Sequence, residues 1–214
     1  MFDLSVRSNE TELMDDASRP ESEFDAAYTE LTAVNRHLGG IRAIERFLPI
    51  DVHSILDVAA GGCDVGEALT RQRSCSVVSL DLNPLGLKLA ERTMPVAGDA
   101  FQLPFRDASF DAVICSLFFH HLQDFDCVRA LSEMWRVAHR IVIVNDLHRH
   151  RLAHAAIRLL SSLFSKSVMF RNDAPASVRR AFRPEELRAL SQRAGISARV
   201  FRSFPYRLVL VAEK

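Results

Sequence analysis

The chain lacks the features that mark secreted and redox-active proteins. Its four cysteines, Cys63, Cys75, Cys115 and Cys127, include no CxxC pair, and the N-terminus does not follow a signal-peptide pattern. These absences fit a reducing compartment. We therefore expect a cytoplasmic protein.

Long hydrophobic runs and an excess of positive charge are also missing. Arg158 and Lys166 interrupt the best candidate for a membrane span, which needs roughly 18 apolar residues. The 27 basic and 27 acidic residues cancel, whereas proteins that hold nucleic acid through its phosphates carry a positive field. We expect neither a membrane span nor a nucleic-acid partner.

Charge is nevertheless distributed unevenly along the chain. Residues 1–30 contain nine acidic residues against two arginines, and residues 147–202 contain twelve arginines and lysines against three acidic residues. The two regions could attract one another or an anionic surface, or each could be an ordinary solvated face.

The pattern of apolar residues predicts one α/β domain. With 214 residues, 48% of them hydrophobic, the chain can bury one substantial core. From Ser54 onward, short apolar runs alternate with amphipathic stretches, which is typical of βαβ units around a parallel sheet. Strands are expected at 54–58, 76–80, 95–98, 110–115 and 141–145, and helices near 64–72, 84–93, 123–138 and 184–194.

The C-terminal end departs from this parallel pattern. Residues 197–203 and 206–212 form a last pair of expected strands, and the connection between them is too short for a parallel crossover. This pair must be antiparallel. The fold expected is a Rossmann-like, seven-stranded, mostly parallel sheet with helices on both faces and an antiparallel last strand.

A helical cap is expected before the sheet. Within residues 23–47, apolar residues at helical spacing are broken by Gly39-Gly40, which predicts two helices that meet at the glycines. We assign residues 1–48 to this cap or lid and residues 49–214 to the sheet domain.

A helical insertion is expected at about residues 147–182, because this connection is longer than ordinary ones. Within it, residues 152–170 are expected to form one amphipathic helix. That helix could be a lid over the pocket, could pack against the sheet, or could contact a membrane surface.

Acidic and small residues follow three consecutive expected strands. The stretch from Ile55 to Asp64 passes from an apolar strand into a helix through small residues, which lets a ligand approach the backbone closely. Asp81 ends the next strand, where an acid can accept both hydroxyls of a ribose. Asp99 follows the third strand and could accept a hydrogen bond from an adenine amino group. This order predicts a nucleoside-containing cofactor at a topological switch point.

At these positions the sequence resembles the class I S-adenosylmethionine (SAM)-dependent methyltransferases, over about residues 40–145 and in outline over 183–214. The resemblance implies SAM as cofactor and S-adenosylhomocysteine (SAH) as its product. It implies that the cofactor is bound by Asn35, Asp57, Ala59, Gly61, Asp64, Asp81, Leu82, Asp99, Ala100 and Cys115. The family also favours glycine at Ala59 and Cys63, so this turn is a degenerate version.

The segment from Gly98 to Leu122 looks closest to the small-molecule branch of that family, which includes the ubiquinone and menaquinone C-methyltransferases and methyltransferases of phenolic polyketides. RNA and protein methyltransferases often carry Asn/Asp-Pro-Pro-Tyr/Phe after the fourth strand, and this chain does not. The resemblance therefore implies a secondary-metabolism enzyme that methylates an oxygen or carbon of a small aromatic, phenolic or quinone-like acceptor.

Two groups of polar residues are catalytic candidates. A phenol or an activated carbon must lose a proton, which an imidazole can accept. His120 and His121 follow the fourth strand, and we expect one ring to point into the pocket and the other outward. One of the two could be the base. Alternatively, one caps the helix near residue 123 and the other lies on the surface. Asp146 and His148 follow the fifth strand and could contact substrate, fix a histidine tautomer, or begin a solvated loop.

The same region offers aromatic lining but no firm metal site. His148, His150 and His154 match no established ligand spacing, so no metal is expected. Apolar side chains that could line a pocket for an aromatic acceptor, or belong to the core, are Phe118, Phe119, Phe164, Met169 and Phe170.

Three alternative functions are each tied to a feature of the sequence. A dehydrogenase would carry GxGxxG, and the glycines after Ile55 do not have that spacing. A catalytically silent scaffold subunit with this fold is suggested by Ala59 and Cys63. A membrane-peripheral quinone methyltransferase is suggested by residues 152–170. The sequence does not identify the acceptor or the oligomeric state.

Overall fold

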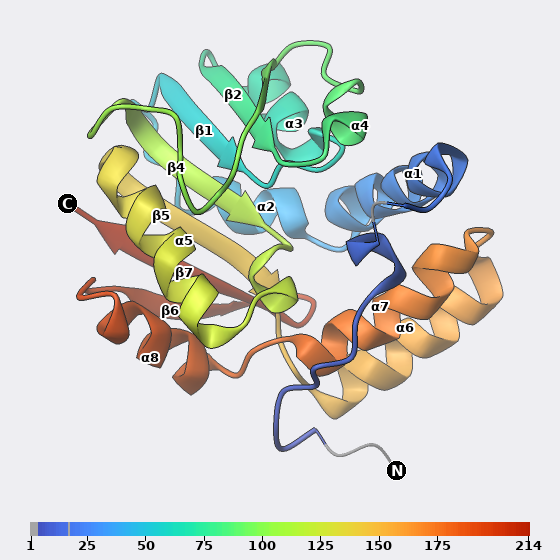
Figure 1. Ribbon diagram of the computed structural model, residues 1–214. Helices are drawn as coiled ribbons and strands as arrows, with labels where there is room; N and C mark the ends of the chain where they lie inside the picture. Colours follow the sequence, from blue (N-terminus) through green and yellow to red (C-terminus); the bar gives the residue numbers. More distant parts are fainter. Residues whose placement is uncertain (1–3, 17) are drawn as a thin grey trace.

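A seven-stranded sheet of order β3-β2-β1-β4-β5-β7-β6 runs through the computed structural model, which describes residues 4–16 and 18–214 (Figure 1). Residues 1–3 and 17 of the expected cap lie outside the described residues. The strands are β1 (Ser54–Val58), β2 (Ser76–Asp81), β3 (Met94–Ala97), β4 (Phe110–Ser116), β5 (Ala138–Leu147), β6 (Arg199–Ser203) and β7 (Arg207–Glu213).

Only β7 runs against the other strands. It pairs antiparallel with both β5 and β6, and the remaining neighbours pair parallel. The predicted mostly parallel sheet with an antiparallel last strand is therefore confirmed.

Helices cover both faces of the sheet because apolar side chains alternate along its central strands. Leu56 and Val58 belong to a core cluster with α5 (Asp124–Val137) and α8 (Pro184–Arg193), whereas Ile55 packs with α2 (Gly40–Glu45) and α3 (Asp64–Gln72). Alternate residues of a strand point to opposite faces, so two helical layers satisfy one apolar run. The other α-helices are α1 (Glu21–His37), α4 (Pro84–Leu87), α6 (Arg151–Phe164) and α7 (Val168–Arg180), with 3-10 turns η1 (Leu13–Asp15) and η2 (Phe119–His121).

The helix expected at 84–93 is wrong beyond its first turn, since α4 ends at Leu87. One carboxylate oxygen of Glu67 accepts hydrogen bonds from the backbone N–H groups of Glu91, Arg92 and Thr93. These N–H groups are thereby satisfied outside a helix, which favours the extended path into β3.

The single helix expected over residues 152–170 is also wrong, because the insertion forms two helices, α6 and α7. Glu30 of α1 accepts hydrogen bonds from the backbone N–H groups of Lys166 and Ser167 at the break, and Ser167 caps α7. One face of α6 contributes to the cavity described below, and its outer face exposes Leu152, Leu159, Leu163 and Phe164. Contact of that face with a membrane surface stays a prediction.

Residues 4–16, here called the N-terminal strap, lie across α7 (Figure 1). The carboxylate of Asp173 accepts hydrogen bonds from the backbone N–H groups of Leu13 and Met14. Arg180 pairs with Asp15 at 2.8 Å. Of the alternatives left open for the two charged regions, the structure shows ion pairs between them, Asp15 with Arg180 and Glu10 with Arg179. Among the described residues, every helix is too short or too polar to cross a bilayer.

Candidate functional site

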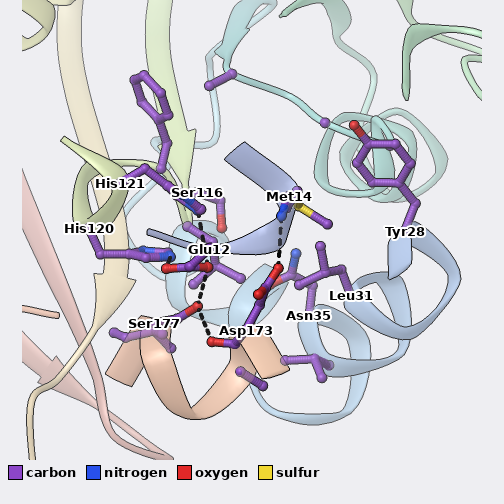
Figure 2. Close-up of a pocket in the computed structure, with 18 of the residues that line it drawn as sticks. Glu12, Met14, Tyr28, Leu31, Asn35, Ser116, His120, His121, Asp173 and Ser177 are labelled. Atoms are coloured by element: carbon purple, nitrogen blue, oxygen red, sulfur yellow. Dashed lines mark hydrogen bonds and ion pairs between the residues drawn. The ribbon is translucent and has the colours of Figure 1, made fainter. Parts of the chain in front are cut away.

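A cavity of about 600 Å³ lies where the carboxyl ends of β1, β2 and β4 face the strap, α1, α6 and α7. Figure 2 shows part of its lining. It has two polar walls. The strand-tip wall is formed by residues 59–62, 64, 81–83 and 98–101 together with Asn35 and Arg207. The histidine wall is formed by Glu12, Asp15, His120, His121 and Ser177.

The turn after β1 brings backbone to the edge of the cavity. Ala59, Gly61 and Cys63 all have positive φ, at 55°, 51° and 61°. For non-glycine residues this left-handed conformation costs on the order of 1–3 kcal/mol. The turn also packs closely on α4, since a Cβ on Gly86 would lie 2.1 Å from the carbonyl oxygen of Gly61.

Asp81 is held in place by backbone donors. Its carboxylate accepts hydrogen bonds from the N–H groups of Gly61 and Asn83, each at 2.8 Å. Burial raises the pKa of Asp81 despite these hydrogen bonds. Leu82, beside it, is exposed along the cavity. The result is an oriented, partly desolvated acceptor at the end of β2.

Asp99 and Ala100 continue the same wall after β3. The Asp99 carboxylate accepts a hydrogen bond from the backbone N–H of Phe101 at 2.8 Å. Asp99 is exposed and Ala100 is buried, and both line the cavity. Of the acids expected at the strand ends, Asp81 and Asp99 therefore lie on one wall.

A third polar group on this wall joins Asp64, Asn35 and Arg207. Burial raises the pKa of Asp64 to about 6, although a hydrogen bond from Asn35 opposes the rise. Arg207, at the start of β7, is 1% exposed and donates from Nη2 to Oδ1 of Asn35 at 3.1 Å. Burial lowers the pKa of Arg207 to about 10. Oδ2 of Asp64 and Nη1 of Arg207 are buried without a hydrogen-bond partner, so both can receive a ligand.

Two of the residues expected to bind cofactor lie behind the wall rather than on it. Asp57 is 1% exposed, and the backbone N–H of Gly66 hydrogen-bonds to it. Burial, and then the charge of Asp64, raise the pKa of Asp57 well above its usual value. Cys115 is fully buried in β4, and the neighbouring Ser116 lines the cavity instead.

Both histidines of η2 line the cavity, so the prediction that one ring points inward and one outward is wrong. They lie on a 3-10 turn, and their ring centroids are 4.3 Å apart. His120 Nδ1 lies 2.7 Å from Oδ1 of Asp146, and His121 Nδ1 lies 2.7 Å from Oδ1 of Asp15. Each imidazole is thus oriented by a carboxylate through one ring nitrogen.

The histidines favour the ionised form of the carboxylates behind these rings. Burial would raise the pKa of Asp146, but the charge and hydrogen bond of His120 lower it on balance. The pKa of Asp15 is likewise lowered despite burial, because His121 and Arg180 hydrogen-bond to it.

Glu12 of the strap reaches between the two rings (Figure 2). Its Oε1 lies 3.9 Å from Nε2 of His120, and its Oε2 lies 3.9 Å from Nε2 of His121. Ser177 donates to Oε2 at 2.7 Å, while Oε1 is buried without a hydrogen bond. Burial raises the pKa of Glu12.

His148 is not part of this arrangement. It lies outside the cavity lining, where its backbone N–H donates to the carbonyl of Tyr206 and its ring is 5.7 Å from that of His150. The structure therefore brings Asp146, but not His148, to the histidine pair.

Only some of the apolar residues expected to line a pocket do so. Phe118 and Phe170 line the cavity, Phe119 and Met169 are buried core, and Phe164 is exposed. Other apolar side chains that line the cavity are Leu31, Val34, Ile157, Leu160 and Val178.

Sequence reasoning missed Glu12, Asp15, Arg180 and Arg207. The acidic excess of residues 1–30 and the basic excess of residues 147–202 were the signals available for the first three. No sequence signal distinguished Arg207 from its neighbours.

Comparison with known proteins was made by family, sequence and structure. A family model described as a methyltransferase domain matches residues 56–141. A demethylmenaquinone methyltransferase of Thermus thermophilus is 30% identical over 179 residues, which cover 74% of this chain and 80% of that relative. The corresponding protein of Deinococcus radiodurans is 38% identical over 92 residues, 39% of this chain and 37% of the relative.

The length of the match varies among these relatives. The demethylmenaquinone methyltransferase of Thermotoga maritima is 34% identical over 104 residues, and this chain spans 44% of it. The matches to the Thermotoga and Deinococcus proteins each cover less than half of the relative's own length.

Solved structures share the fold at low identity. A SAM-dependent methyltransferase from Aquifex aeolicus has a TM-score of 0.66 and 15% identity, and the match covers 92% of this chain and 99% of that one. Human N-acetylserotonin methyltransferase in complex with SAM has a TM-score of 0.68 and 17% identity, over 95% of this chain and 59% of that one.

Proposed function

Since the chain belongs to the class I SAM-dependent methyltransferases, we propose that it transfers the methyl group of SAM to an oxygen or carbon of a small aromatic, phenolic or quinone-like acceptor. The observation that carries this proposal is the single cavity in which acids at strand ends face a pair of carboxylate-bound histidines. The relatives named demethylmenaquinone methyltransferase support a lipophilic, quinone-like acceptor.

The strand-tip wall would hold the cofactor. Asp81, oriented by two backbone N–H groups, would accept the ribose hydroxyls. Asp99 and Ala100 would border the adenine. Asp64 would accept the ammonium group of SAM and Arg207 its carboxylate, because each keeps a buried polar atom without a partner.

Asp57 and Cys115 would support the cofactor indirectly. Both lie behind the cavity surface. The hydrogen bond from the backbone N–H of Gly66 to the Asp57 carboxylate would fix the turn after β1 relative to α3.

Methyl transfer from a sulfonium is a direct displacement, so the protein must align the acceptor with the methyl group and exclude water. The strap, α6 and α7 cover the cavity on the side facing the strand ends. We therefore keep residues 1–48 as a cap in this proposal, together with the insertion at 147–182.

The histidine wall would take the acceptor's proton. Asp146 and Asp15 hold Nδ1 of the two rings, so the Nε2 atoms are the available bases, and both rings line the cavity. The two residues are equivalent in this respect. The apolar residues around them suit an aromatic ring.

The test is an assay of the purified protein with SAM and a panel of reduced demethylmenaquinones, catechols and simple phenols, read by mass spectrometry of the products. A methylated quinol or phenol is the expected result. SAH binding without methylation of any member would instead favour the catalytically silent scaffold.

A further inference from the structure

We propose that Glu12, His120 and His121 together bind one divalent transition-metal ion on the histidine wall. The three side chains offer one ligand atom each, and these atoms all lie within 4.8 Å of one another. Two histidines and one carboxylate are a ligand set typical of non-haem iron and related divalent sites. This departs from the expectation of no metal, which considered only His148, His150 and His154.

The orientation of both imidazoles suits metal binding. Each ring has its Nδ1 within 2.7 Å of a carboxylate, Asp146 for His120 and Asp15 for His121. A proton on Nδ1 leaves the lone pair on Nε2, and this carboxylate–histidine arrangement is the usual outer shell of a metal-ligating histidine. Both Nε2 atoms then face the same carboxylate, that of Glu12, at 3.9 Å. A single general base would need only one such ring.

The charge of the cluster leaves room for a dication. With both imidazoles neutral, as metal binding requires, Glu12, Asp15 and Asp146 carry three negative charges against the one positive charge of Arg180, so the cluster then has two uncompensated negative charges. Arg207 also lies near Asp146 but is shared with Asp64. Buried charges are costly unless they are paired. One divalent ion supplies the missing charge.

The third ligand is available and the site is open on one side. Oε1 of Glu12 is buried without a hydrogen bond, whereas Oε2 is held by Ser177. All three ligands line the cavity. Three protein ligands with a free position are the pattern of a catalytic rather than a structural ion.

The ligand spacing is wider than that of a filled site. Metal–ligand distances of about 2.0–2.1 Å place ligand atoms about 3.4 Å apart around a tetrahedral ion. The observed 3.9 Å distances join the two rings to different oxygens of Glu12, and one ligand atom from each residue gives separations within 4.8 Å. The ligand atoms would therefore move together by up to about 1.4 Å around a bound ion.

The inference goes beyond the proposed methyl transfer, because ion binding requires neither cofactor nor acceptor. With the ion bound, both Nε2 atoms are ligands. A phenol or enol oxygen of the acceptor could then coordinate the ion, which favours its deprotonated form.

The test uses the full chain after chelator treatment, titrated with zinc chloride by calorimetry, with bound metal counted by inductively coupled plasma mass spectrometry. We expect one zinc ion per wild-type chain. Glu12→Gln and His121→Ala should weaken zinc binding by about tenfold or more. The matched control is His150→Ala, which removes a histidine outside the cavity and should leave zinc binding unchanged.

SAH binding by every variant separates loss of the site from loss of the fold. Zinc uptake that is the same in wild type, Glu12→Gln and His121→Ala, or absent from wild type that still binds SAH, would overturn the proposal. Methyl transfer by metal-free protein at the full rate would overturn a role of the ion in the reaction and leave the proposed function intact. Zinc binding without methyl transfer to any acceptor would count against the proposed function alone.

Discussion

The strand-tip wall and the histidine wall face each other across one cavity, but the chain assembles them in different ways. Most of the strand-tip wall comes from one stretch, residues 59–101, in which the polar residues lie at or shortly after the end of a strand. The histidine wall joins Glu12 to His120 and Ser177, which are more than 100 residues away from it. The first wall is encoded locally and the second only by tertiary contacts.

The electrostatics of the two walls differ as well. On the strand-tip wall, burial raises the pKa of both Asp64 and Asp81. On the histidine wall, the pKa values of Asp15 and Asp146 are lowered by the histidines they contact. The strand-tip wall therefore gains most from a positively charged ligand such as SAM, whereas the carboxylates behind the histidines already have partners.

The largest expected effect would separate the two walls by function. His120→Ala, made together with His121→Ala because either ring could act as the base, should lower the rate of methyl transfer by about 10²–10⁴-fold, the usual contribution of a positioned acid–base group, and should leave SAH affinity nearly unchanged. Steady-state kinetics and calorimetry measure the two quantities. His148→Ala, a histidine outside the cavity, is the matched control. A parallel loss of SAH affinity in the double variant would contradict the division between the walls.

The converse prediction is that a substitution on the strand-tip wall weakens cofactor binding. Asp81→Ala should weaken SAH binding by about 1.5–3 kcal/mol, the value of hydrogen bonds to a charged group, which corresponds to roughly 10- to 150-fold. Calorimetric titration measures this. The control is Asp126→Ala, a half-buried acid on α5 outside the cavity lining, which should bind SAH as wild type does. An unchanged affinity in Asp81→Ala would remove the ribose assignment.

The pH dependence of cofactor binding should follow the raised pKa of Asp64, about 6 in the free protein. The ammonium group of SAH favours the carboxylate, so the pKa of Asp64 should fall on binding. The affinity for SAH is then highest above pH 6 and decreases as the pH drops below 6, by up to about tenfold per pH unit. Titrations between pH 5 and pH 8 measure the profile. Asp64→Asn should bind more weakly at pH 8 and show a flatter profile, and an unchanged profile would contradict the assignment.

The smallest effect concerns backbone strain in the turn after β1. Ala59→Gly should stabilise the fold by about 1 kcal/mol, because glycine adopts the positive φ of this position without strain. Urea unfolding measures the change in free energy. Ala155→Gly, at an exposed position within α6, should destabilise by about the same amount. Destabilisation by both substitutions would show that Ala59 is not strained.

The fold was predictable because its signals are local. Apolar runs and the small-residue turn after Ile55 gave β1 its observed bounds, and the short final connection required antiparallel pairing of β6 and β7. The errors lie where a distant carboxylate satisfies backbone N–H groups, as Glu67 does after α4 and Glu30 does between α6 and α7. Such contacts leave no periodic trace in the sequence.

In the site, only the residues at strand ends were predictable. Asp81 and Asp99 could be located because each follows a strand, and parallel strands end at one edge of a sheet. Glu12 could not be located, because its position depends on how the strap docks on α7. Arg207 could not be located either, since its burial depends on the packing of α1 against β7 through Asn35.

The most direct test of the two-wall account is a crystal structure of the protein with SAH bound. The account predicts the ribose hydroxyls on Asp81, the adenine beside Asp99, and the sulfur facing the side of the cavity that holds His120 and His121. A nucleoside bound outside this cavity, or one with its ribose on the histidine wall, would contradict it.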